Sequence, residues 1–142
     1  MASFHMDGVE ALTKQLENLA DLSELAPKMI DAAKPTVAES LKKNINIAAD
    51  RGYATGELAE SVTATKARLN NYGYFASVLV SGTDAKGVRN GEKLAYLEYG
   101  TSTQTAHPVM RKAVNESEEG AIQKMQDVFN ASAFIQDMIG RR

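Results

Sequence analysis

The sequence predicts an α+β fold, in which an antiparallel sheet of about three strands packs against N-terminal helices and a long C-terminal helix. In the first third and again near the end of the chain, apolar residues recur at steps of three and four, the period of a helix face. Between these regions, apolar and polar residues alternate and turn-forming residues interrupt them, as in strands joined by a hairpin. The 142 residues, 44% of them hydrophobic, suffice for one core, so we expect a single domain over residues 1–142.

The N-terminal third is predicted to contain two helices. The first covers residues 7–21, where four apolar residues share one face. The second covers residues 23–49 and carries an apolar stripe along most of its length. Pro27 suits the first turn of this helix, whereas Pro35 removes an internal backbone donor. We therefore expect the helix to kink or restart at Pro35.

The middle of the chain predicts an antiparallel hairpin. Its strands are expected over residues 62–67 and 74–80, with turn-forming residues at 70–73 between them. Both faces of the second strand carry apolar side chains, which favours a strand covered on both sides. Residues 92–99 are compatible with either a short helix or a third strand, and the sequence leaves these two alternatives open.

Two segments are expected to be mobile or to wait for a partner. Residues 82–91 contain three glycines and almost nothing to bury, so we predict a flexible loop there. Pro108 opens a long final helix as its first residue. Beyond that helix, the tail over residues 131–142 either docks on the domain or remains mobile until a partner binds it.

The composition excludes several functional classes. The chain has no cysteine, which rules out thiol catalysis, Cys-ligated zinc and disulfides, and two histidines leave little for a metal site. With 16 basic against 18 acidic residues, the surplus of cations that attracts polyanions is missing. No apolar run approaches the length of a membrane span and no signal-peptide pattern opens the sequence, so we expect a cytoplasmic origin without a membrane partner. Neither a cofactor nor a metal is predicted.

His107 is the residue on which an enzyme hypothesis would depend, with Ser61, Glu98 or Asp84 as acid–base or nucleophile partners. A structural role is favoured, because His107 directly precedes Pro108 at a helix start, where a polar side chain can bond the first turn. The sequence therefore predicts that the protein is not an enzyme.

Four tyrosines lie in the second half of the chain and could stack on nucleic-acid bases. Arg and Lys do not alternate with them, which favours core or interface aromatics instead. These residues are Tyr72, Tyr74, Tyr96 and Tyr99.

Two short motifs are more specific than any of these features. The first reads T-G-x-L-x-x-S, and the second reads E-Y-G-T and is followed by H-P. The motif residues are Thr55, Gly56, Leu58, Ser61, Tyr96, Glu98, Tyr99, Gly100, Thr101, His107 and Pro108. With the helical N-terminal third and the hairpin between them, these motifs resemble the gp-ten-like family of tailed-phage morphogenesis proteins, named after a small head-to-tail protein of the phage Hong Kong 97.

The resemblance implies a non-enzymatic virion assembly protein with an α+β fold. It implies a ring at the head–tail junction, as a tail-completion or connector component, in contact with head-connector and tail proteins and passed by DNA without sequence-specific binding. The chain would be in the host cytoplasm during assembly and then in the virion neck or tail end. Alone, we expect it to be monomeric or weakly associated. The rival hypothesis is a small DNA-binding or DNA-processing factor, which needs basic residues gathered on one surface.

Five of the motif residues have an expected physical role. Gly56 holds a turn that a side chain would obstruct, Leu58 anchors that turn in the core, and Ser61 satisfies backbone donors. Gly100 allows a sharp chain reversal. Glu98 is either an exposed charge or a carboxylate that caps a neighbouring backbone or meets an arginine of an adjacent subunit.

Overall fold

A computed structural model describes the backbone of residues 9–52, 56–132 and Gly140. The fold is α+β, as predicted, with four helices and four short strands in the described part of the chain. The helices are α1 (Val9–Asp50), α2 (Gly56–Glu60), α3 (Asn90–Tyr99) and α4 (Val109–Asn130). The strands are β1 (Val62–Ala64), β2 (Arg68–Asn70), β3 (Gly73–Phe75) and β4 (Val78–Val80). No described helix combines the length and the apolar character that a membrane span requires.

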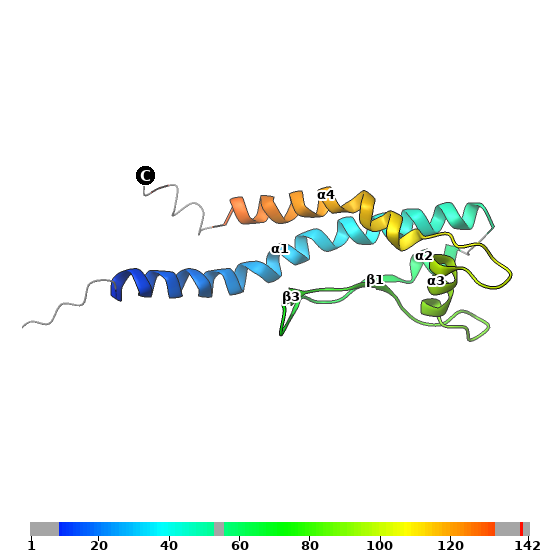
Figure 1. The fold of residues 1–142 in the computed structure, drawn as a ribbon, viewed down its shortest axis with the longest axis horizontal. Helices are drawn as coiled ribbons and strands as arrows, with labels where there is room; N and C mark the ends of the chain where they lie inside the picture. The colour runs from blue at the N-terminus through cyan, green and yellow to red at the C-terminus, as the bar shows by residue number, and fades with distance from the viewer. Residues whose placement is uncertain (1–8, 53–55, 133–139, 141–142) are drawn as a thin grey trace, which may run out of the picture.

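The molecule is elongated, with α1 running along its length. Figure 1 shows α4 on one side of α1 and the strands on the other, while α2 and α3 gather near the C-terminal end of α1. The N-terminal part of α1 extends beyond both neighbours. The chain therefore presents the hairpin and α4 in opposite directions.

The N-terminal third forms one helix of 42 residues, so the prediction of two helices is wrong. Pro27 and Pro35 both lie inside α1. Each proline removes one backbone hydrogen bond, but the C-terminal half of α1 packs on both sides, which compensates for that local loss. In Figure 1 the axis changes direction along the helix, which agrees with the predicted kink rather than with a restart.

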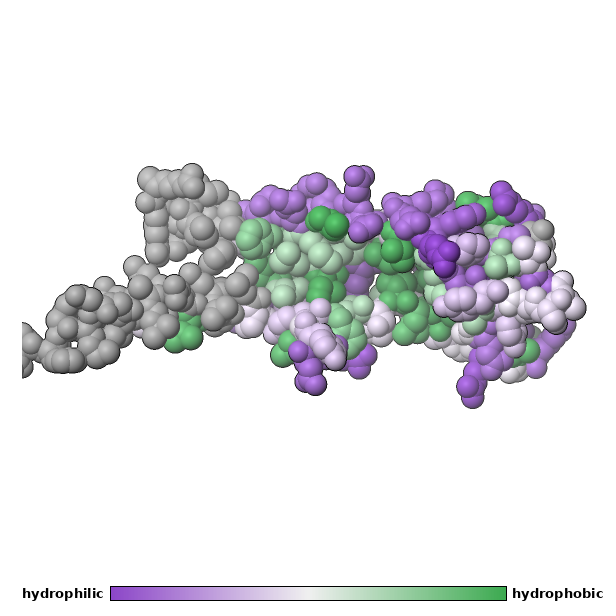
Figure 2. All heavy atoms as spheres, viewed as in Figure 1, coloured by the Kyte–Doolittle hydropathy of each residue, from purple (hydrophilic) through white to green (hydrophobic). Residues whose placement is uncertain are grey.

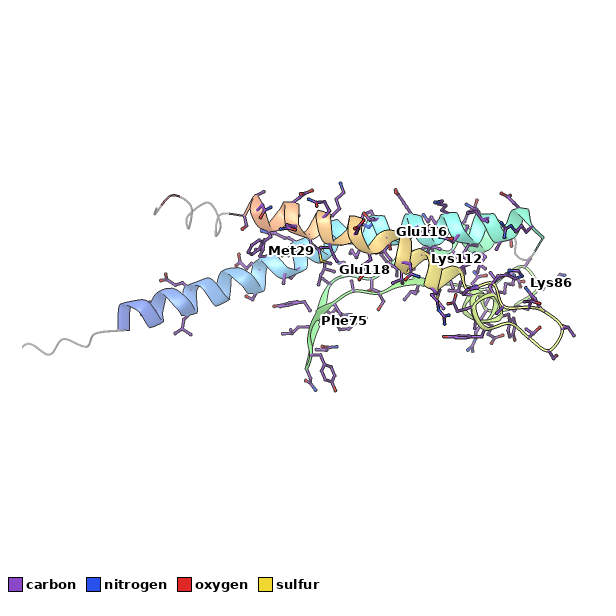
Figure 3. All side chains as sticks on the ribbon, turned by 45° about the horizontal axis from the view of Figure 1, so that its top comes forward. Met29, Phe75, Lys86, Lys112, Glu116 and Glu118 are labelled. Atoms are coloured by element: carbon purple, nitrogen blue, oxygen red, sulfur yellow. The ribbon has the colours of Figure 1, made fainter. Side chains whose placement is uncertain are left out.

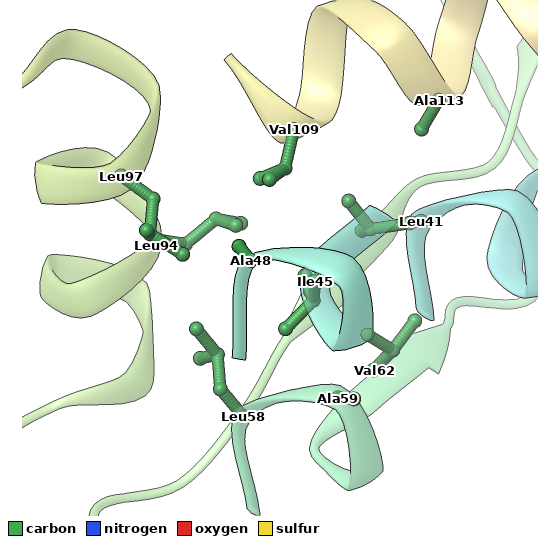
Figure 4. Close-up of a cluster of buried hydrophobic side chains, with 10 residues drawn as sticks. All are labelled: Leu41, Ile45, Ala48, Leu58, Ala59, Val62, Leu94, Leu97, Val109 and Ala113. Atoms are coloured by element: carbon green, nitrogen blue, oxygen red, sulfur yellow. The ribbon is translucent and has the colours of Figure 1, made fainter. Parts of the chain in front are cut away.

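The hydrophobic core lies where the C-terminal half of α1 meets α2, α3, β1 and the start of α4 (Figure 4). Ile45, Leu58 and Leu97 are its largest fully buried side chains. The predicted anchoring role of Leu58 is confirmed, since only 1% of this residue is exposed. The cluster consists of Leu41, Ile45, Ala48, Leu58, Ala59, Val62, Leu94, Leu97, Val109 and Ala113.

Small residues let α4 approach α1 closely. A Cβ atom added at Gly120 would lie 3.1 Å from the Thr36 methyl group. The hydroxyl of Ser40 donates to the carbonyl oxygen of Ala113 at 3.1 Å. The buried α4 residues on this side include Ala113, Ser117 and Ala121. The α1–α4 contact therefore depends on short side chains.

The predicted hairpin is present, but it is divided into two two-stranded antiparallel sheets instead of forming part of a three-stranded sheet. β1 pairs with β4 and β2 pairs with β3. The turn lies between Asn70 and Gly73, as the sequence predicts, and the Asn70 side chain accepts a hydrogen bond from the backbone N–H of Tyr72. The prediction that both faces of the second strand are covered is wrong. α1 covers one face, and Phe75 remains 36% exposed and Leu79 39% exposed.

Three further expectations are decided by the described residues. The sequence left a helix and a strand open for residues 92–99, and these residues form a helix, because they belong to α3. Asn90 and Gly91 also belong to α3, which shortens the predicted loop. Pro108 precedes α4 in the capping position instead of serving as its first residue. The predicted tail falls largely on residues 133–139 and 141–142, outside the described part of the chain.

Candidate interaction surface

The hairpin ends in an exposed, largely apolar tip, which we define as Arg68, Leu69, Tyr72 and Phe75. Leu69 is 65% exposed and Tyr72 is 98% exposed. The Arg68 guanidinium lies over the Phe75 ring, 5.6 Å from its centre. In Figure 3, Phe75 lies on the hairpin, well away from α4. Burial of these side chains within their own chain is small, so the tip contributes little to the core.

A bulge separates the two halves of the hairpin. Residues 65–67 on one strand lie opposite residues 76–77 on the other, as the flanking registers require. The Thr65 backbone N–H donates to the Ser77 carbonyl at 2.8 Å, and the Ser77 N–H donates to the Thr65 hydroxyl oxygen at 2.9 Å. An extra residue in one strand bends the pair. Figures 1 and 3 accordingly show the tip turning away from α1.

The base of the hairpin is anchored to α1. The Lys34 ammonium donates to the Thr65 carbonyl at 3.0 Å and pairs with Asp31 at 2.7 Å. Val62 is buried in the core, and Val78 and Val80 pack against it. The hairpin therefore holds its tip in a defined direction from the helical body.

Glu98 caps α4. Its two carboxylate oxygens accept hydrogen bonds from the backbone N–H groups of Met110, at 2.8 Å, and Arg111, at 3.2 Å. The residue is only 8% exposed. Of the alternatives that the sequence left open, the structure therefore selects the backbone cap, and the carboxylate is unavailable to an arginine of another subunit.

Gly100 makes the sharp reversal predicted for it between α3 and α4. Its φ of 77° and ψ of 176° lie in a region that side chains avoid. A Cβ atom at this position would lie 2.9 Å from both the Ala106 nitrogen and the Gln104 carbonyl oxygen. The Thr101 hydroxyl accepts from the Gln104 N–H at 3.0 Å and closes the turn. The second motif thus builds the α3–α4 connection.

His107 serves this same connection through its backbone. Its N–H donates to the Leu97 carbonyl at 2.6 Å, and its own carbonyl accepts from the Val109 N–H at 2.7 Å. The half-buried side chain borders a cavity of about 20 Å³ beside Arg51 and Lys112, which is room for a single water molecule. Such a cavity is too small for a substrate.

The partners suggested for His107 are engaged elsewhere. The Ser61 hydroxyl donates to the Leu58 carbonyl at 2.7 Å, and the Asp84 carboxylate pairs with Lys93. Both oxygens of Glu98 bind the start of α4. These contacts give structural roles to His107 and to its three suggested partners.

The first motif runs through α2 and leads into the hairpin. Two of its residues have roles different from those expected. Nothing lies within 4 Å of a Cβ atom built at Gly56, so the predicted obstruction is wrong. Ser61 satisfies a backbone acceptor, the Leu58 carbonyl, where a role toward donors was expected. Thr55 lies outside the described residues.

The tyrosines of α3 are surface residues. Tyr96 is 48% exposed and Tyr99 is 75% exposed, so the core alternative is wrong for both. Leu94 and Leu97 occupy the buried face of the same helix. A role for the two tyrosines at an interface stays a prediction.

Asp84 organises the loop between β4 and α3. One of its oxygens accepts from the backbone N–H groups of Lys86, at 2.9 Å, and Val88, at 2.8 Å, and the other pairs with the Lys93 ammonium. The Lys93 ammonium and, after it, the Val88 N–H hold the pKa of the Asp84 carboxyl below its usual range. The mobility predicted for this loop remains a prediction.

We expect the fold of this loop to depend on pH through Asp84. Because its pKa is lowered in the folded chain, the stabilising hydrogen bonds are complete above the ordinary Asp pKa of about 4 and are lost as the pH falls through the folded value. The amide signals of Lys86 and Val88 should titrate together in an NMR experiment, with a midpoint below that of an unfolded Asp. Asp84→Asn should remove the titration, whereas Glu92→Gln should leave it unchanged.

Among the described residues, no group of three or more His, Cys, Asp or Glu side chains is arranged to hold a metal ion. Of the hairpin tip, the sequence pointed only to Tyr72, as a core or interface aromatic, because Arg68, Leu69 and Phe75 have the pattern of ordinary strand residues. The signal that could have found it is the presence of large apolar residues, Leu69 and Tyr72, next to and within the turn, where polar residues are usual. Comparisons with protein-family models, with curated proteins and with solved structures find no match for this chain.

Proposed function

We propose that this chain is a structural component of the head–tail junction of a tailed phage or prophage, where its copies form a ring through which DNA passes. The observation that carries the proposal is the anchored hairpin with its exposed apolar tip, where Tyr72 is 98% exposed. Exposed apolar residues gathered at one place favour a protein–protein contact. The order and spacing of the two motifs supply the link to phage assembly.

The arrangement of the elements supports a ring. Closed rings need contacts between two different surfaces of neighbouring subunits. The hairpin and α4 lie on opposite sides of α1 and provide two such surfaces (Figure 1). The proposal covers a tail-completion ring and a head-closure adapter alike, with the virion neck or tail end as its location.

The rival DNA-binding function has less support from the surface charges. Lys34, Lys43 and Lys93 each pair with a carboxylate of the same chain. Lysines neutralised in this way add little to the attraction for phosphate.

Loss of the chain should leave heads and tails unjoined. In a lysogen carrying the gene, deletion should yield separate DNA-filled heads and tails, or incomplete tails, in electron micrographs after induction. The wild-type chain supplied in trans should restore joined particles and be detected in the neck or tail end by immunogold labelling. A variant with Leu69→Ser and Tyr72→Ser should fail to restore them, whereas Val88→Ser, an exposed apolar residue elsewhere, should succeed.

Two results would overturn the proposal. Normal joined particles in the deletion strain would remove the chain from the junction. A defect in DNA replication or packaging, together with salt-dependent binding of the purified chain to DNA, would favour the rival function.

A further inference from the structure

α4 carries an exposed stripe on the side that does not pack on α1. We define this acceptor stripe as Val114, Glu118 and Ile122, which follow one another at steps of four and so lie along one side of the helix. Val114 is 56% exposed and Ile122 is 55% exposed. The packing of α4 on α1 buries only the residues that face α1, so it does not account for two large apolar side chains at Val114 and Ile122.

The acidic residue at the centre of the stripe is uncompensated. Glu118 has no ion-pair or hydrogen-bond partner among the residues that the structure describes. Glu116, which leaves α4 on another side (Figure 3), pairs with Lys43 at 3.6 Å and accepts from Asn44 at 3.0 Å. The stripe therefore offers a free carboxylate between two apolar side chains.

The hairpin has the opposite character. Between Val62 and Val80 the only charged residues are Lys66 and Arg68, and both are exposed. In α4, by contrast, the segment from Ala113 to Asn130 contains four acidic residues and one basic residue. The tip thus combines a cation with apolar side chains, and the acceptor stripe combines an anion with apolar side chains.

From this complementarity we infer that the hairpin tip of one copy of the chain docks on the acceptor stripe of a second copy. Arg68 faces Glu118 of the other copy, and Phe75, which shares a face of the hairpin with Arg68, packs on its Val114 and Ile122. The apolar contacts remove exposed surface from water, and the charge pair fixes the register. The inference deepens the proposed function, since it names the contact from which a ring would be built.

The fold makes this contact head to tail. Because α1 lies between the hairpin and α4 (Figure 1), a copy that receives a tip on its α4 still presents its own tip on the far side. Such a heterologous contact repeats from copy to copy and closes into a ring when the rotation between copies allows it. Figure 2 shows hydrophilic residues along the outer edge of α4 and hydrophobic residues in the band between α4 and the hairpin.

Cysteine cross-linking tests the contact directly, because the chain has no native cysteine. Phe75→Cys and Ile122→Cys are made in separate full-length chains, and each is first shown to keep the wild-type circular dichroism spectrum. Under mild oxidation, the mixture should form disulfide-linked dimers about tenfold faster than either variant alone, since a heterologous contact joins unlike positions. A chain with both substitutions should give a ladder of oligomers.

Two controls give the test its specificity. Phe75→Cys mixed with Gln123→Cys should cross-link no faster than the single variants, since Gln123 is exposed and lies about 100° around the helix from Ile122. Arg68→Glu or Glu118→Arg should each slow the Phe75–Ile122 cross-link by about tenfold, and the two together should restore it. Glu119→Arg is the matched charge reversal and should have little effect. Each cross-linking rate is divided by the rate at which the same thiol reacts with a small disulfide reagent. This division removes the effect of neighbouring charge on the thiol.

The outcomes separate this inference from the proposed function. Equal cross-linking of the mixture and the single variants, or the absence of rescue by the double charge reversal, would overturn the contact. If the deletion strain nevertheless lacks joined particles, the junction function stands and the tip binds another component. If the cross-link and its rescue are observed while the deletion strain makes normal particles, the contact stands and the proposed function fails.

Discussion

Replacement of Gly100 by alanine should destabilise the protein by about 2–5 kcal/mol, as the sum of backbone strain and overpacking. The strain arises because a φ of 77° with a ψ of 176° is a conformation that glycine alone adopts readily. The overpacking arises because the new methyl group would lie 2.9 Å from the backbone of Gln104 and Ala106. Gln104 belongs to the turn closed by Thr101, and Ala106 directly precedes His107, whose N–H donates to the Leu97 carbonyl, so neither neighbour can move alone. Urea denaturation followed by circular dichroism measures the loss.

Alanine substitutions at two other glycines distinguish the backbone strain from the overpacking. Gly87 has a φ of 81° but nothing within 4 Å of its Cβ position, so Gly87→Ala should cost about 1 kcal/mol from strain alone. Gly56 has neither the strained φ nor a close neighbour, so Gly56→Ala should be neutral or stabilising by up to about 1 kcal/mol. Equal losses at Gly100 and Gly87 would contradict the packing argument.

Removal of the Glu98 carboxylate should cost about 2–4 kcal/mol in the variant Glu98→Leu, because two backbone N–H groups at the start of α4 lose their acceptors. The negative charge also interacts favourably with the N-terminal end of the helix dipole. Glu98→Gln keeps one acceptor oxygen and should lose about half as much. Thermal and urea unfolding of the two variants provide the comparison.

Glu92→Leu is the control for this experiment. Glu92 is an exposed carboxylate in the first turn of α3, the helix that also contains Glu98. Its replacement should therefore change stability by no more than about 0.5 kcal/mol. A loss in Glu98→Leu as small as that in Glu92→Leu would show that water replaces the cap at no cost. The buried position of Glu98 has a second consequence: a defect in Glu98→Arg would reflect misfolding, and the subunit contact has to be tested at exposed residues such as Glu118.

The sequence by itself determined those features that depend on neighbouring residues. Helix periodicity and the turn chemistry at residues 70–73 led to the α+β class and to the hairpin, because both signals are properties of a short segment. The reversal at Gly100 was predictable for the same reason, since the absence of a side chain acts on the local backbone. The start of α4 was also located to within one residue, because Pro108 restricts its own backbone.

Tertiary structure decided what depends on partners far along the chain. α1 continues through Pro35 because α4 and the hairpin pack on its C-terminal half and offset the missing hydrogen bond. Residues 92–99 are helical because Leu94 and Leu97 enter the same core as Ile45. Glu98 became a cap only when the chain reversal brought it beneath the first turn of α4. The bulge at Thr65 aims the hairpin tip, and it arises from the pairing of two strands, a relation that neither strand's own sequence expresses.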